Sequence, residues 1–367
     1  MSHEIVEEQL ILKIANKIIS SKKYADIDDE FIICLVKSFS TRYPTKLLED
    51  KVRGKLHQIR GAYFSESLFI EKILNKFPYL DNMTDDNNPI TVFDFINMLD
   101  YIILQHSSTK ERAEESDKFW SDTFDIYGKL YDQKITKLVD LGCGVNFLTY
   151  IKWLLINSSK SNKNISLGEF QDDNNSTKEN RPSSDFLLSK EILKDYLVDY
   201  YEGWDIGKSE LEISEFISRY FLEHYSGSFE KHTDQGMKKS FADKDAFNTY
   251  LFSGIASDVM KYPVRNNLLT NIDIANNRFD CVLLLKVLQN LEQVDKGNAI
   301  QLLKKIDTNL LVVSFPTRSL GGKTKDMDTN YSSWFEGIIS ESDYQIYEQT
   351  QIGSDIIFYC VKRQNQS

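Results

Sequence analysis

The chain has 367 residues, 41% of them hydrophobic and 27% charged, and a formal net charge of -11 at pH 7. This length and apolar content exclude a disordered chain and predict one large and one smaller folded domain. The acidic total counts against a nucleic-acid partner unless basic residues gather locally.

The N-terminus MSHEIVEEQL has neither a basic n-region nor an apolar h-region, and the sequence contains no apolar run of the roughly 18 residues that span a membrane. We therefore expect a cytoplasmic protein without a membrane partner. His224 and His232 lack metal-ligand spacing, so we expect no metal site. The cysteines lie among apolar neighbours without C-x-x-C spacing, which predicts buried reduced thiols. They are Cys34, Cys143, Cys281 and Cys360.

Helical periodicity dominates the first hundred residues, and strand signals are almost absent there. We expect a helical domain over residues 1–105. Its predicted helices span residues 5–19, 29–40, 45–59, 66–77 and 91–104.

A basic cluster lies inside this helical region. Between residues 37 and 60, seven Lys and Arg residues stand against two acids, a local charge of +5. The cluster is either a solvated basic helix face or a docking surface for a polyanion.

From residue 106 to 367, short apolar strands alternate with helices, which predicts an α/β domain with a parallel sheet. A last pair of strands, joined by the turn Ile352-Gly-Ser, is expected to form an antiparallel hairpin at one edge. Polar stretches at residues 157–184 and 226–244, and a smaller one at 266–277, predict surface insertions. The predicted strands span residues 137–141, 196–204, 250–255, 279–285, 310–315, 344–351 and 355–361.

The segment from Leu138 to Asn146, LVDLGCGVN, predicts a strand that enters a glycine turn ahead of a helix. Gly142 and Gly144 allow the backbone to approach a ligand closely and expose amide donors at a helix N-terminus. A dinucleotide site would need a third glycine where Phe147 stands. The D-x-G-x-G form, starting at Asp140, resembles motif I of class I S-adenosylmethionine-dependent methyltransferases. A turn without a ligand is the alternative.

Two acidic residues follow the next predicted strands. Asp205, with Glu202 as the competing choice, could accept hydrogen bonds from two ribose hydroxyls, although such an aspartate is often only a helix cap. Asp258 follows the strand at 250–255, where such folds bring a side chain near an adenine amine.

The segment HSSTKER, residues 106–112, joins the two predicted domains. It predicts a capping box, with Ser108 as N-cap and Glu111 at N3 of a helix through Phe119 and Phe124. Arg112 could in addition hold the methionyl carboxylate of the cofactor with its planar fork.

Together, four segments resemble the aminoglycoside-resistance 16S ribosomal RNA (guanine(1405)-N(7))-methyltransferases. The resemblance covers nearly the whole chain apart from the insertions. The segments are LHQIRGAYF at residues 56–64, HSSTKER at 106–112, DLGCGVN at 140–146 with LLLKVL at 283–288, and SFPTRSLGGKTKDM at 314–327 with NYSSWFE at 330–336.

This resemblance implies a Rossmann-like methyltransferase domain, a helical domain that docks on the 30S subunit, and S-adenosylmethionine as cofactor. It assigns the cofactor contacts to Thr109, Arg112, Asp140, Gly142, Gly144, Asp205, Asp258, Leu285 and Lys286. It places the RNA contacts at Lys51, Arg53, Lys55, His57, Arg60, Arg318, Lys323, Lys325 and Tyr331. The loop after Phe315 would then contact phosphate beside the target guanine.

Three residues depart from the family pattern and change the expected pocket geometry. Phe147 stands where the family tends to have proline after motif I, and Gln289 stands where it has proline after LLLK-x-L. Gly207 replaces an aspartate that the family often has two places after the ribose-binding Asp205.

The implied reaction needs no general acid or base, because guanine N7 has a free lone pair and no proton. Lys286 and His106 are therefore expected only to position groups, and Tyr331 or Trp334 could stack on the flipped base. The alternatives are a methyltransferase for another RNA position or a small molecule, and a non-enzymatic ribosome-binding protein. We expect a monomer.

Overall fold

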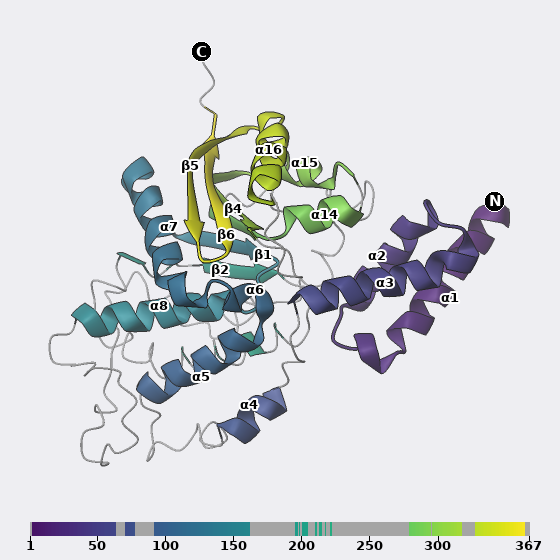
Figure 1. The fold of residues 1–367 in the computed structure, drawn as a ribbon, viewed down its shortest axis with the longest axis horizontal. Coiled ribbons are helices and arrows are strands. Elements are labelled where there is room, and N and C mark those ends of the chain that lie inside the picture. The colour runs from purple at the N-terminus through teal and green to yellow at the C-terminus, as the bar shows by residue number, and fades with distance from the viewer. Residues whose placement is uncertain are drawn as a thin grey trace, which may run out of the picture.

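The computed structural model describes residues 2–63, 70–77, 92–161, 200–204, 279–294, 296–317 and 327–363, together with single residues between 195 and 221. Helices α1, α2 and α3 extend to one side of a mixed sheet that carries helices on both faces (Figure 1). Within these ranges, no helix is both long enough and apolar enough to cross a membrane.

The N-terminal helices pack around a small core of their own. The side chain of Asp28 accepts a hydrogen bond from the backbone N–H of Phe31 at 3.0 Å and so caps the second helix. Buried residues such as Ile18, Leu35 and Val52 fill the space between the helices. The elements are α1 (Ser2–Ile19), the 3-10 turn η1 (Lys22–Tyr24), α2 (Asp29–Ser40) and α3 (Thr45–Tyr63).

The sheet has the order β2-β1-β3-β4-β6-β5. Its first four strands are parallel, and β6 and β5 form an antiparallel hairpin at one edge. The predicted hairpin, its turn and its edge position are confirmed. The strands are β1 (Lys137–Leu141), β2 (Tyr200–Trp204), β3 (Phe279–Leu285), β4 (Thr308–Pro316), β5 (Tyr344–Ile352) and β6 (Asp355–Lys362).

Each face of the sheet has its own core, because successive side chains of a strand point to opposite faces. Along β3, Cys281 and Leu283 join one core while Val282 and Leu284 join the other. The first core contains α4 (Ile70–Lys76), α5 (Val92–Gln105), α7 (Ser116–Tyr131) and α8 (Asn146–Ser161). The second contains α14 (Leu288–Val294), α15 (Asn298–Leu303) and α16 (Met327–Ser340). The result is the three-layer α/β arrangement that the alternating pattern predicts.

Two predicted boundaries are wrong. The strand expected at residues 196–204 begins only at Tyr200, because the backbone is still helical at residues 195 and 196, where the ring of Tyr196 packs edge-on against Phe124 and Trp153. The insertion expected from residue 157 begins later, because α8 continues to Ser161. The predicted strand at 250–255, the insertion at 226–244 and the smaller one at 266–277 lie outside the described residues.

The packing favours a boundary between the two domains before residue 105. The boundary expected at residue 105 stays a prediction. Helix α5 buries Phe95, Leu99 and Ile102 in the same core as α7 and α8. The helical region formed by α1–α3 instead meets the sheet domain at α6 (Ser107–Lys110) and at α14. Val294 packs into the N-terminal core, and the Lys55 ammonium donates to Gln293 Oε1 at 2.7 Å.

Candidate functional site

The predicted cofactor residues that the structure describes gather at the carboxyl edge of the parallel strands. The chain passes from β1 to β2 on one side, whereas β3 lies on the other side of β1. In open α/β sheets, ligands bind at such a switch point, outside the carboxyl ends of the strands. The segments that end here are the glycine turn after β1, Lys286 after β3 and Thr317 after β4.

The glycine turn has the backbone that its sequence predicts. Gly142 and Gly144 have positive φ angles of 76° and 51°. A Cβ on Gly142 would lie 2.7 Å from Val287 Cγ2, and a Cβ on Gly144 would lie 2.5 Å from His106 Cε1. Both positions therefore need glycine, for the conformation and for the close approach of neighbouring segments.

The carboxylate of Asp140 stabilises this turn through hydrogen bonds. Its side chain is fully buried, and Oδ2 accepts hydrogen bonds from Asn146 Nδ2 at 2.8 Å and from the Tyr201 hydroxyl at 3.0 Å. Burial, and then the charge of Asp140, raises the pKa of Tyr201 well above its usual range, so this hydroxyl stays a donor. The carboxylate thus ties the start of α8 and the strand β2 to the end of β1. Its predicted contact with a cofactor stays a prediction.

His106 lies over the glycine turn and caps the short helix α6 (Ser107–Lys110). Its Nδ1 accepts a hydrogen bond from the Thr109 backbone N–H at 3.4 Å and lies 2.9 Å from the Thr109 hydroxyl. Nδ1 is therefore an acceptor, and Nε2 carries the ring hydrogen. Burial, and then the charges of Arg112 and Lys286, lowers the pKa of His106 from 6.5 to about 3. The imidazole is neutral at pH 7.

The predicted capping box is wrong. His106, not Ser108, is the N-cap, and α7 begins separately at Ser116 after the 3-10 turn η3 (Ala113–Glu115). Glu111 does not reach back to a cap, because its carboxylate forms an ion pair with the ammonium of Lys286.

Replacing His106 with Gln should flatten the pH dependence of stability. Because the folded protein holds this imidazole neutral, its contribution is complete above pH 6.5 and is lost as pH falls toward about 3. In this window the free energy of unfolding of the wild type should fall by about 1.4 kcal/mol per pH unit more than that of the variant. Urea denaturation at pH 7.5, 6 and 5 measures both slopes. Parallel slopes would contradict the assignment.

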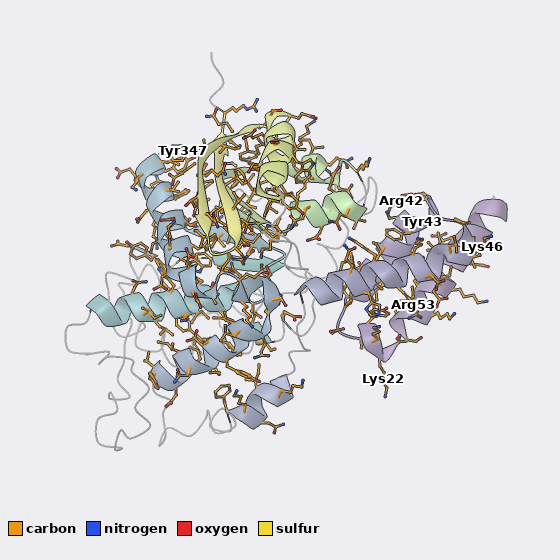
Figure 2. All side chains as sticks on the ribbon, viewed as in Figure 1. Lys22, Arg42, Tyr43, Lys46, Arg53 and Tyr347 are labelled. Carbon is orange, nitrogen blue, oxygen red and sulfur yellow. The ribbon has the colours of Figure 1, made fainter. Side chains whose placement is uncertain are left out.

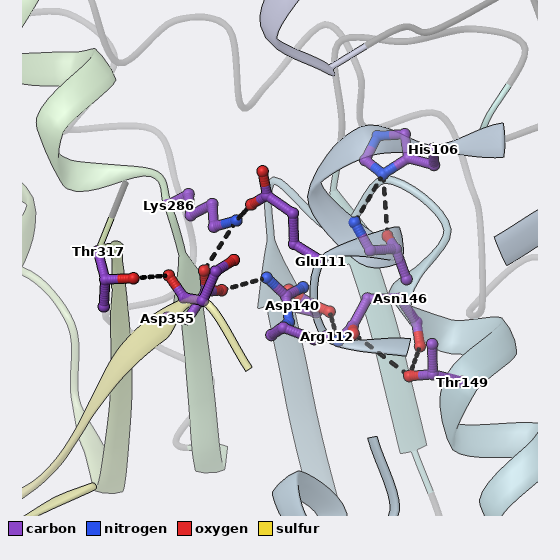
Figure 3. A network of polar contacts seen from close by, with 11 residues as sticks. His106, Glu111, Arg112, Asp140, Asn146, Thr149, Lys286, Thr317 and Asp355 are labelled. Atoms are coloured by element: carbon purple, nitrogen blue, oxygen red, sulfur yellow. Dashed lines mark hydrogen bonds and ion pairs between the residues drawn. The ribbon is translucent and has the colours of Figure 1, made fainter. Parts of the chain in front are cut away.

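Four charged side chains form a cluster beside the glycine turn (Figure 3). Arg112 Nη1 donates to Asp355 Oδ2 at 2.7 Å, and Lys286 Nζ lies 2.9 Å from Asp355 Oδ1, an ion pair without a hydrogen bond. Lys286 also pairs with Glu111. Arg112 and Lys286 are 4% and 5% exposed, and Asp355 is fully buried. The backbone of Lys286 has a φ of 61°, a sparsely populated conformation typical of functional sites.

The turn of the β5–β6 hairpin is fixed against this cluster. Gly353 has a φ of 58°, and a Cβ there would lie 2.5 Å from the backbone carbonyl oxygen of Glu111. From the end of β4, the backbone N–H and the hydroxyl of Thr317 both donate to the Ser354 carbonyl, at 2.7 and 2.8 Å. The first residue of β6, Asp355, is thereby held at the carboxyl edge of the sheet.

The predicted RNA contacts on α3 differ in their accessibility. Lys51 and His57 are exposed, and Arg53 is half-buried beside Tyr24 and bonded to Glu49 at 3.0 Å (Figure 2). His57 also contacts the ammonium of Lys23.

Lys55 is placed differently from the prediction. It is 8% exposed and holds α3 to Gln293 of α14, and burial lowers its pKa. We therefore remove Lys55 from the proposed RNA surface.

Tyr331 and Trp334 both pack against Phe315 at the end of β4. The rings of Tyr331 and Phe315 stack with centroids 5.4 Å apart, and Trp334 meets Phe315 edge-on at 5.7 Å. Both are half-buried at the margin of the second core. Phe315 thus supports one face of Tyr331, which stays the proposed stacking partner.

Leu285 is buried in the first core at the end of β3, directly before Lys286. Asp205, Asp258, Arg318, Lys323 and Lys325 lie outside the described residues, as does the side chain of Arg60.

Sequence reasoning missed Asp355, Tyr201 and Asn146 as parts of the site. Asp355 follows a Gly-Ser turn and is the first residue of an apolar strand. This position is the only feature of the local sequence that could have pointed to Asp355. Asn146 is the first residue of α8, where a polar residue is ordinary.

Comparisons with known proteins show which proteins this chain is similar to. Residues 256–359 match the family described as ribosomal RNA methyltransferase (FmrO). A 16S rRNA (guanine(1405)-N(7))-methyltransferase from Serratia marcescens is 42% identical over 84 residues, which cover 23% of this chain and 33% of that protein. A protein of the same name from Proteus mirabilis is 22% identical over 96% of this chain and 97% of its own length. The chain is a relative of these methyltransferases.

A solved structure shows the same fold. The 16S rRNA methyltransferase RmtF, in complex with S-adenosyl-L-homocysteine, aligns with a TM-score of 0.55 over 96% of this chain and 98% of that one, at 18% identity. The fold is thus that of a class I S-adenosylmethionine-dependent methyltransferase with an N-terminal helical region. Phe147, which departs from the family pattern, is buried against Tyr201 with ring centroids 4.6 Å apart. It therefore contributes to the core behind the glycine turn.

Proposed function

We propose that this chain transfers a methyl group from S-adenosylmethionine to N7 of guanine 1405 in 16S rRNA, within the 30S subunit, and so confers aminoglycoside resistance. The observation that carries the proposal is the packing of the His106–Arg112 segment on the Gly142–Gly144 turn at the switch point of the sheet. Sequence similarity to a protein named for this reaction, over 97% of that protein's length, supports the proposal. We also propose a cytoplasmic monomer.

The residues of the turn fit a methionine-derived cofactor. When bound, S-adenosylmethionine supplies a methyl group on a sulfonium sulfur. Gly142 and Gly144 have no side chains, and the side chain of Cys143 between them is buried. Arg112 has further N–H donors for a carboxylate, because Asp355 accepts from one of them. A neutral His106 adds no positive charge beside a sulfonium. Asp205 and Asp258 are the proposed partners of the ribose and the adenine.

This chain needs to orient the target base and has no proton to remove from it. The lone pair of guanine N7 is free at pH 7, so neither His106 nor Lys286 is assigned as a general base. Both are proposed to fix the geometry of the approach, which is the main source of rate in such a transfer. Tyr331, supported by Phe315, is the proposed stacking partner of the flipped guanine.

The proposed RNA surface has two parts. One is on helix α3 of the helical region, with Lys51, Arg53, His57 and Arg60. The other is the loop after β4, with Arg318, Lys323 and Lys325, whose cations would contact phosphate near the target base.

Labelled methyl transfer to isolated 30S subunits tests the proposal directly. Incubation with methyl-labelled S-adenosylmethionine should label 16S rRNA, and borohydride reduction followed by aniline cleavage should cut at position 1405. Label at another position, or on a small molecule alone, would support a different methyltransferase. A chain that binds subunits but no S-adenosyl-L-homocysteine would be a non-enzymatic binding protein.

A further inference from the structure

One buried carboxylate is shared by two cations that come from different parts of the chain. We propose that Asp355 is a positioning residue of the methyl-donor site, which holds Arg112 and Lys286 in place at the edge of the glycine turn. This inference rests on the proposed function and adds the C-terminal hairpin to the machinery of the site.

The contacts of Asp355 are divided between its two oxygens. Oδ2 accepts a hydrogen bond from Arg112 Nη1 at 2.7 Å, and Oδ1 lies 2.9 Å from Lys286 Nζ. Arg112 is separated from Asp355 by 243 positions in the sequence and belongs to the segment that packs on Gly144 through His106. Lys286 precedes Val287, which packs on Gly142. Asp355 therefore connects the two segments that flank the turn on either side.

The backbone around Asp355 leaves its carboxylate little freedom. On one side, Gly353 lies so close to the Glu111 carbonyl that a Cβ would come within 2.5 Å. On the other side, Thr317 holds the Ser354 carbonyl through two hydrogen bonds. Asp355 itself is paired in register with Pro316, the last residue of β4. A carboxylate whose backbone is fixed by two other chain segments can orient flexible cations, because it does not move with them.

The charges of the cluster balance only while Asp355 is ionised. Two cations, Arg112 and Lys286, stand against two carboxylates, Asp355 and Glu111, and the side chain of Glu111 is 40% exposed. Without the charge of Asp355, two buried cations would share one carboxylate at the margin of the solvent. Buried charges that lose a partner repel each other and move apart. The guanidinium would then leave the position in which its hydrogen bond to Asp355 now holds it.

The test is the affinity for S-adenosyl-L-homocysteine, measured by calorimetry on the full chain. Asp355→Asn keeps the shape of the side chain and removes its charge. We expect this variant to bind at least about tenfold more weakly than the wild type, with a KM for S-adenosylmethionine that rises more than kcat falls. In an Arg112→Gln background, the same change should weaken binding by less than about threefold, because the group through which Asp355 acts is then absent.

A matched control lies at the opposite end of the sheet, where Asp307 directly precedes β4 and Lys362 ends β6. Asp307→Asn removes the partner of Lys362 in an exposed ion pair near the other end of β6. This variant should bind S-adenosyl-L-homocysteine as the wild type does. Equal weakening in both variants would mean that the hairpin as a whole was disturbed, and would overturn the inference.

The outcomes separate this inference from the proposed function. If the wild type binds and methylates but Asp355→Asn binds within threefold of it, the inference fails alone. If the wild type takes up no S-adenosyl-L-homocysteine, both fail. Should Asp355→Asn not fold, the double variant with Lys286→Met restores the charge balance. Its affinity is then compared with that of Lys286→Met alone, where equal affinities would overturn the inference and a further tenfold loss would support it.

Discussion

Gly144→Ala should abolish measurable binding of S-adenosyl-L-homocysteine and, with it, methyl transfer. Gly144 has a φ of 51°, and a left-handed backbone costs an alanine about 1–2 kcal/mol. The new Cβ would also lie 2.5 Å from the ring of His106, which is buried and cannot turn aside freely. The turn or the ring must shift, and either movement displaces the amide donors from the ligand. We expect the Kd to rise at least about a hundredfold.

The matched control for this change is Gly337→Ala in α16. A Cβ at Gly337 meets no atom within 4 Å, and the residue lies in the interior of a helix. Alanine there should stabilise the protein slightly, by about 0.5–1 kcal/mol, and leave the affinity unchanged. Thermal unfolding of both variants separates loss of the fold from loss of the site. Gly144→Ala protein that is folded and binds normally would refute a ligand role for the turn.

The glycine turn could be predicted from sequence because its determinants are local. Gly142 and Gly144 follow an apolar strand and precede a helix, and only glycine adopts both of the observed φ angles without strain. The strands at 137–141 and 279–285 could also be predicted from the sequence, because buried parallel strands are short apolar runs.

The charge cluster could not be predicted, because its members meet only in the folded chain. Asp355 contacts Arg112 across 243 positions, and Lys286 meets Glu111 across 175. For Glu111 the local sequence even predicted a different role, because its spacing from Ser108 matches a capping box. Glu111 instead forms an ion pair with Lys286, because two buried cations, Arg112 and Lys286, share the one buried carboxylate of Asp355 and need a second counter-charge.

Lys55, in the helical region, is another residue whose contacts could not be predicted from the local sequence. In sequence it is one of seven basic residues between positions 37 and 60. In the fold it lies where α3 meets α14, and its ammonium donates to Gln293 across 238 positions. Composition gives the charge of a segment but not the neighbour that covers one of its residues. The exposed cations must therefore be chosen from the structure.

Three exposed cations around Tyr43 should carry much of the affinity for the ribosome. Lys51 Nζ lies 5.5 Å from the centre of the Tyr43 ring, and Arg42 and Lys46 flank the same residue along the chain (Figure 2). All three cations are exposed. Basic groups that contact phosphate release counterions, so each contact adds about one unit to the slope of log K against log salt.

Replacing these three residues with Gln should raise the KM for 30S subunits by roughly 10- to 100-fold at physiological salt and reduce its salt slope by up to about three units. The affinity for S-adenosyl-L-homocysteine should not change, because none of the three belongs to the glycine turn or the charge cluster. Lys129→Gln with Lys137→Gln is the control, since both lysines are exposed and neither is near the carboxyl edge of the sheet: Lys129 lies in the last turn of α7, and Lys137 is the first residue of β1. If the triple variant and the control both methylate subunits like the wild type, these three cations belong only to a solvated helix face, and docking must depend on other residues.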